Sequence, residues 1–204
     1  MIVASRDGDI VTLRIDRPSK ANALTAAMLH ELADHVSDLG DCKALILTSA
    51  GHVFSAGADL DEARAGLATD PVWERLSGGI ASAPCLTVAT LPGTVAGGAM
   101  GMVLACDLRV AAPGTRFFYP VMRLGYLPQP SDPARLLRLA GPSAARRILL
   151  GGEKLTAKEA LACGLIDDIV ARDDLTARAH ALCADARGAT PQHIAAIKQM
   201  LTVT

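Results

Sequence analysis

Two glycine-rich segments about forty residues apart are the residues in this sequence best suited to chemistry. The first reads Phe54-Ser55-Ala56-Gly57-Ala58-Asp59-Leu60, and the second runs from Pro92 to Gly101 and contains Gly93, Gly97 and Gly98. Small side chains at such strand-to-helix turns let a ligand approach bare backbone N–H groups. If the two turns face each other, two N–H donors bind one oxygen atom. We therefore predict an oxyanion hole, which stabilises a carbonyl that gains negative charge.

The hydrophobic pattern predicts the elements that must position these turns. Strands are expected at 2–6, 10–15, 43–49, 85–91 and 107–111, and the first two form a hairpin around Asp7-Gly8-Asp9. Helices are expected after a Thr25 cap and at 133–139, 143–150, 157–162, 175–186 and 191–201. Asp132 before Pro133 is the pattern of a helix N-cap followed by proline in the first turn. Alternation of strands and helices predicts a mixed α/β core with parallel strands.

Composition narrows the class of protein. A chain of 204 residues, 50% of them apolar and 20% charged, is long enough for one domain with a substantial core. The net charge of −1 gives no electrostatic case for binding nucleic acid. Five cysteines without CxxC spacing predict reduced thiols in a cytoplasmic protein, and we predict no metal site. The N-terminal residues lack the pattern of a signal peptide.

Two other interpretations of the glycine-rich region are disfavoured. No charge occurs between Arg75 and Asp107, a stretch long enough to span a bilayer, but it contains Pro84, Pro92 and six glycines. We predict a helix end, a buried strand, a ligand loop and a buried helix there, and no membrane association. The glycine spacing also does not fit the G-x-G-x-x-G pattern of a dinucleotide-binding turn.

The order of several motifs resembles the crotonase (enoyl-CoA hydratase/isomerase) superfamily. The matching stretches are Arg17-Pro18 with Asn22-Ala23-Leu24, the turn at 54–60, Gly93 with Gly97-Gly98, Cys106-Asp107, and 149–165. The resemblance implies a crotonase-like spiral of ββα units with C-terminal helices. It implies one domain over 1–204, with a spiral core at about 1–140 and a helical part at about 141–204 that is shorter than is usual in the family. It also implies a homo-oligomer, a trimer or a dimer of trimers.

The resemblance further implies an acyl-CoA thioester as ligand, with coenzyme A as part of the substrate and no permanently bound cofactor. The oxyanion-hole N–H groups then belong to Ala58 and Gly98. The residues expected to bind substrate or coenzyme A are Lys20, Ala21, Ala23, Ala56, Ala58, Asp59, Leu60, Gly97 and Gly98.

The acid–base residues depart from the family's pattern. Hydratases of this family use two glutamates, and those positions are Gly101 and Val121 here. Neither side chain exchanges a proton, so ordinary hydration is not expected. The base position of some isomerases is Gln129, whose amide orients groups but is no base. Tyr119 and Gln129 remain as candidate catalytic donors, although Tyr119 also suits a packing role.

We therefore expect an enoyl-CoA hydratase/isomerase family protein that binds an acyl-CoA thioester and stabilises an enolate. One alternative is decarboxylation of a malonyl-type thioester, in which the leaving CO₂ itself generates the enolate. The other is a non-catalytic protein that binds coenzyme A or an oligomer partner on the same scaffold.

Overall fold

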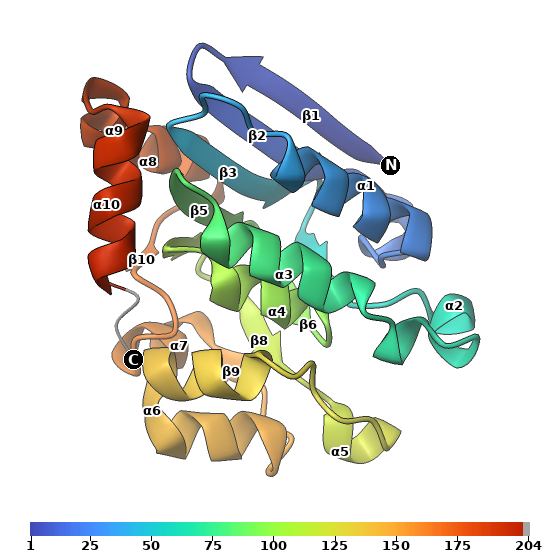
Figure 1. The fold of residues 1–204 in the computed structure, drawn as a ribbon. Coiled ribbons are helices and arrows are strands. Elements are labelled where there is room, and N and C mark those ends of the chain that lie inside the picture. The colour runs from blue at the N-terminus through green and yellow to red at the C-terminus, as the bar shows by residue number, and fades with distance from the viewer. Residues whose placement is uncertain (202–204) are drawn as a thin grey trace.

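The computed structural model describes residues 1–201, which form two sheets flanked by helices (Figure 1). The six-stranded sheet has the order β1 (Ile2–Asp7), β2 (Ile10–Ile15), β3 (Ala44–Ser49), β5 (Leu86–Leu91), β7 (Leu108–Ala111) and β10 (Asp168–Ile169). The four-stranded sheet has the order β4 (Val53–Ser55), β6 (Thr94–Ala96), β8 (Arg116–Phe118) and β9 (Leu155–Thr156). Neighbouring strands are parallel except in the pairs β1–β2 and β8–β9. The predicted mixed α/β core with parallel strands is confirmed.

Successive strands alternate between the two sheets. Strands β3, β5 and β7 belong to the first sheet, while β4, β6 and β8 follow them in the second, and each pair leads into a helix. The chain therefore winds as a spiral of ββα units. The α-helices are α1 (Ala26–Ser37), α2 (Leu60–Arg64), α3 (Val72–Ser82), α4 (Ala99–Ala105), α5 (Val121–Leu124), α6 (Asp132–Leu149), α7 (Ala157–Ala162), α8 (Leu175–Leu182), α9 (Ala184–Gly188) and α10 (Pro191–Leu201). Short 3₁₀ helices occur at η1 (Pro18–Lys20), η2 (Leu67–Thr69) and η3 (Arg172–Asp174).

Strand β3 shows why its sequence is apolar throughout. Leu45 and Leu47 pack into the main core with residues of α1, α3 and α4, whereas Ala44 and Ile46 pack on the opposite face with residues of α8. Alternate strand residues face opposite sides of a sheet, so a strand covered on both sides must be continuously hydrophobic. Figure 1 shows α1 and α3 running side by side along one face of this sheet.

Most predicted elements are present, and two details differ. The hairpin is confirmed, and the Thr25 hydroxyl caps α1 by accepting a hydrogen bond from the Met28 N–H at 3.2 Å. The predicted break within α6 occurs at Gly141, which has a φ of 74°. The helix expected at 175–186 is instead two helices, α8 and α9. The predicted capping role of Asp132 is wrong, because its side chain points into the protein and caps nothing.

The charge-free stretch between Arg75 and Asp107 lies in the core. It forms the end of α3, the buried strand β5, the loop with strand β6, and helix α4, all of whose residues are buried. Within residues 1–201, no helix combines the length and the apolar character that crossing a membrane requires.

Candidate functional site

The site forms where three parallel strands end. Strands β4, β6 and β8 are neighbours, with Ser55 opposite Val95 and Ala96 opposite Phe118. Carboxyl ends of adjacent parallel strands meet at the same edge of a sheet. The turn at 56–59, the turn at 97–98 and the segment 119–121 therefore lie together, although they are far apart in sequence.

The two glycine turns touch through their backbones. Gly57 has a φ of 93° and Gly97 a φ of 56°, conformations that favour glycine. A Cβ atom on Gly57 would lie 3.0 Å from the Ala96 carbonyl oxygen and 3.5 Å from the Gly97 Cα. A Cβ atom on Gly97 would lie at an ordinary 3.8 Å from the Gly57 Cα, so the close approach of the two turns depends mainly on the glycine at 57.

Within residues 1–201, the N–H groups of Ala58 and Gly98 have no protein acceptor. The Leu24 N–H donates to the Gly57 carbonyl and the Asp59 N–H donates to the Leu24 carbonyl, both at 2.8 Å. The N–H of Ala58 between them therefore points away from Leu24. Gly98 precedes the first turn of α4, where backbone N–H groups lack helical partners. Neither N–H donates to a protein acceptor in the described part of the chain, and both residues line a cavity of about 120 Å³.

The remaining walls of this cavity are mainly apolar. The Trp73 ring packs beside Gly98, and its Nε1 donates to the Leu67 carbonyl at 2.8 Å, which fixes the ring. Leu60 and Leu127 also line the cavity and are 70% and 85% exposed. An apolar chain entering the cavity would cover these exposed leucines, which favours an aliphatic ligand.

Tyr119 and Gln129, both predicted site residues, line the cavity as well. The Gln129 side chain donates through Nε2 to the Ala68 carbonyl at 3.0 Å, and its backbone N–H donates to the Tyr119 hydroxyl oxygen at 3.2 Å. The Tyr119 hydroxyl in turn donates to Asp132 Oδ2 at 3.0 Å. Burial, together with the nearby Asp132 charge, raises the pKa of Tyr119 well above its usual value, so the phenol stays protonated.

The prediction from sequence missed Asp132 as part of this site. Its side chain is 1% exposed, and its Oδ1 atom accepts no hydrogen bond within residues 1–201; the Arg135 Nη1 atom lies 3.7 Å away. Burial raises the pKa of Asp132 to about 7. The carboxyl group lies against Gly101, where a Cβ atom would be only 2.7 Å from Oδ1. A carboxylate is thus present beside α4, but it comes from α6.

The residues expected to bind substrate or coenzyme A lie on the loop at 17–23 and on the two glycine turns. The Ala56 N–H donates to the Ala21 carbonyl at 3.0 Å, so the loop and the first turn are joined. Arg17 Nη1 lies 2.7 Å from Asp59 Oδ2 and holds the pKa of that carboxyl below its usual value. Asp59 also caps α2 by accepting a hydrogen bond from the Asp61 N–H. Ala23 lies on this loop, Lys20 and Leu60 are exposed, and Ala58, Gly97 and Gly98 face the cavity.

Asn22 fastens the loop at 17–23 to the strands of the site. It is buried, accepts from the Arg17 N–H at 2.8 Å, and donates to the carbonyls of Ala50 and Val53.

Replacing Asn22 with Ala removes all three bonds and should lower the free energy of unfolding by about 3 kcal/mol, measured by urea denaturation. The Lys20→Ala change, at an exposed position of the same loop, should stay within about 0.5 kcal/mol. Equal effects of the two changes would contradict this role.

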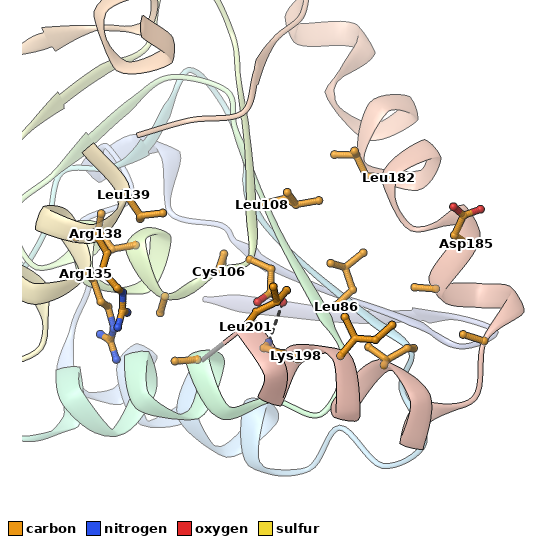
Figure 2. A pocket seen from close by; sticks show the side chains of 18 of the residues that line it. Leu86, Cys106, Leu108, Arg135, Arg138, Leu139, Leu182, Asp185, Lys198 and Leu201 are labelled. Atoms are coloured by element: carbon orange, nitrogen blue, oxygen red, sulfur yellow. Dashed lines mark hydrogen bonds and ion pairs between the residues drawn. The ribbon is translucent and has the colours of Figure 1, made fainter. Parts of the chain in front are cut away.

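A second and larger cavity, of about 770 Å³, lies under α10 (Figure 2). Leu86, Leu108 and Leu182 line it, and Lys198 Nζ donates across it to Asp107 Oδ2 at 2.8 Å. Asp107 also accepts hydrogen bonds from the Thr87 N–H and hydroxyl, so it links the end of α4 to β5. No residue of either glycine turn lines this cavity in the described part of the chain, so it is separate from the site above.

Fold and site together define a class of α/β proteins in which ββα units form a spiral and two glycine turns meet at one sheet edge. Comparison with known proteins identifies the family. The chain belongs to the enoyl-CoA hydratase/isomerase family, whose model matches residues 5–204. The fold is accordingly the crotonase-like spiral that the sequence predicted.

Individual relatives cover nearly the whole chain. "Probable enoyl-CoA hydratase EchA17" of Mycobacterium tuberculosis is 34% identical over 202 residues, which are 95% of this chain and 77% of the relative. An enoyl-CoA hydratase/isomerase from Pseudoalteromonas atlantica has a TM-score of 0.90 and 28% identity, covering 98% of this chain and 82% of the other. An enoyl-CoA hydratase from Bacillus anthracis has a TM-score of 0.91 and 26% identity, with the same coverage of 98% and 82%.

Proposed function

We propose that this protein binds an acyl-CoA thioester and stabilises its enolate between the N–H groups of Ala58 and Gly98. The observation that carries the proposal is that these two groups lie on touching turns, line one cavity and donate to no protein acceptor within residues 1–201. An oxygen that gains negative charge there would satisfy both donors at once. The names of the relatives, enoyl-CoA hydratases and isomerases, support a thioester as the ligand.

The binding residues follow from the same geometry. The acyl group would enter the apolar cavity beside Trp73 and beneath Leu60 and Leu127. The remainder of coenzyme A would follow the surface formed by the loop at 17–23 and the turn at 56–59, where Lys20 is exposed and suited to a phosphate. Coenzyme A belongs to the substrate in this proposal, and no separate cofactor is needed.

Among enolate-forming reactions, we favour decarboxylation of a malonyl-type thioester over hydration of an enoyl thioester. Gly101 and Val121 supply no acid or base to activate water. Loss of CO₂ breaks the bond between Cα and the carboxylate, and its electron pair moves into the enolate that the two N–H groups stabilise. Purified protein should therefore turn over methylmalonyl-CoA much faster than it hydrates crotonyl-CoA. Brisk hydration of crotonyl-CoA would overturn this preference.

The oxyanion hole is tested by deleting one N–H group. Gly98 has a φ of −58°, which a proline accepts, so Gly98→Pro removes the donor with the backbone angle retained. The matched control is Gly98→Ala, which keeps the N–H and adds the same Cβ atom about 3.0 Å from the Trp73 ring. We expect kcat for the proline variant to be about 10²–10³-fold below that of the alanine variant.

Three results, one from this pair of variants and two from thioester binding, bear on the proposal. A kcat ratio near one between the two variants, both folded by circular dichroism, would contradict the role of the Gly98 N–H. Saturable binding of several CoA thioesters with no turnover would favour a non-catalytic binding protein. The absence of any thioester binding would overturn the proposal as a whole.

A further inference from the structure

A buried carboxyl group connects to the small cavity through a single hydroxyl. Asp132 is reached from the cavity through Tyr119, which lines the cavity and donates to Asp132 Oδ2 at 3.0 Å. The Tyr119 oxygen accepts one hydrogen bond, from the Gln129 N–H at 3.2 Å. A hydroxyl oxygen has two lone pairs, so one of them remains available to a bound molecule.

The surroundings of Asp132 do not provide what a purely structural carboxylate needs. Oδ1 accepts no hydrogen bond in the described chain, and the side chain is 1% exposed. Buried polar groups are normally satisfied, and an unsatisfied one requires an explanation. Arg135 gives only a distant ion pair at 3.7 Å, since its Nη1 atom donates to the Ser77 hydroxyl at 2.8 Å.

Helix α4 makes room for this carboxyl group at Gly101. A Cβ atom there would overlap Asp132 Oδ1 at 2.7 Å, so any side chain at this position is incompatible with the observed place of Asp132. The combination of a glycine, an unsatisfied carboxyl oxygen and a tyrosine bridge to the cavity suits proton transfer better than packing.

We propose that Tyr119 and Asp132 form the proton-transfer pair of this site, with Tyr119 as the catalytic residue and Asp132 as the positioning residue behind it. The proposal rests on the thioester binding proposed above. As the Cα–H bond of the bound thioester breaks, its electron pair moves into the enolate oxygen. The proton goes to the Tyr119 oxygen while the Tyr119 hydroxyl proton passes to Asp132 Oδ2. The reverse transfer protonates an enolate, including one formed by loss of CO₂.

The test is exchange of the α-protons of butyryl-CoA in D₂O, followed by mass spectrometry, because it reports proton transfer without requiring decarboxylation. Wild-type protein should incorporate deuterium at Cα. Tyr119→Phe keeps the ring and loses only the hydroxyl, and it should slow the exchange about 100-fold or more. Binding of butyryl-CoA, measured by calorimetry, should remain close to that of the wild type.

The pH profile separates proton transfer from a structural role of Asp132. The groups that face Asp132 are Tyr119, Arg135 on the same helix, and Glu74 of α3, which accepts from Ser131. Helix α4 contributes no titratable side chain. Because the pair takes a proton only when Asp132 is ionised, wild-type exchange should rise through its pKa of about 7. Asp132→Asn should be slow and independent of pH in this range.

A rescue experiment moves the carboxyl group from position 132 to position 101 and measures whether proton exchange returns. Asp132→Gly should slow exchange about 100-fold, and combining it with Gly101→Glu, whose side chain would grow into the vacated volume, should recover at least about tenfold. Gly101→Glu alone should not reach the exchange rate of the wild type, since the Glu side chain at 101 would overlap the Asp132 carboxyl group.

The possible failures are distinguishable. If wild-type protein does not bind butyryl-CoA, the thioester proposal fails and the proton-transfer pair fails with it. If butyryl-CoA binds but no exchange occurs, or if folded Tyr119→Phe exchanges at the wild-type rate, the pair is overturned while the thioester proposal stands.

Discussion

Replacing Gly93 with Ala should leave no stably folded protein. Gly93 lies between β5 and β6, and a Cβ atom there would be 1.8 Å from the His52 carbonyl oxygen and 2.7 Å from its carbon. Both are backbone atoms next to β4, so no side-chain rotation relieves the overlap. Relief requires separating β4 from β6, the pair that aligns the two glycine turns. We expect a loss of at least about 4 kcal/mol, a large part of the stability of an ordinary domain.

The measurement is the urea midpoint of purified protein, with far-ultraviolet circular dichroism and soluble yield where no transition is seen. The matched control is Gly78→Ala in α3, where a Cβ atom meets nothing within 4 Å. Because glycine is a poor helix former, this control should gain about 0.5–1 kcal/mol. A Gly93→Ala protein with a midpoint near that of the wild type would refute the close contact with His52.

Local patterns were sufficient to predict five strands of the six-stranded sheet and most helices, but not β10 or the four short strands of the second sheet. Strand β3 is apolar because both its faces are covered, and the Thr25 cap and the break at Gly141 follow from the chemistry of single residues. The two glycine turns were also predicted from their composition, although the short strands β4 and β6 that lead into them were not. Their contact depends on the pairing of β4 with β6, which lies in the three-dimensional arrangement and not in either motif.

The role of Asp132 could not be predicted from local pattern. An aspartate before a proline normally indicates a helix cap, and nothing in residues 131–133 shows that the side chain turns inward. The glycine at 101 indicated only that α4 supplies no acid. The structure joins the two facts, because the carboxyl group from α6 occupies the space that a side chain at 101 would need. Trp73, which covers Gly98, was missed for the same reason: the contact links distant segments.

Asp132 should also make folding stability depend on pH in an unusual direction. Burial raises the pKa of its carboxyl from 3.8 to about 7 in the folded protein. A carboxyl with a raised pKa contributes fully below its unfolded pKa, and this contribution is lost as pH rises through about 7. Asp132→Asn cannot ionise, so its stability relative to the wild type should improve between pH 4.5 and pH 8. The upper limit of the improvement is about 4 kcal/mol, from a shift of about three pKa units.

The Asp59→Asn change provides a control of opposite sign. The hydrogen bond from Arg17 lowers the pKa of Asp59, so the stability that Asp59 contributes is present above the unfolded pKa and is lost as pH falls. Relative to the wild type, Asp59→Asn should therefore improve toward acid, whereas Asp132→Asn improves toward base. Urea unfolding at several pH values measures both trends. Parallel trends in the two variants would show that Asp132 does not carry a buried, destabilised charge, and its proton would then not be available to Tyr119 near neutral pH.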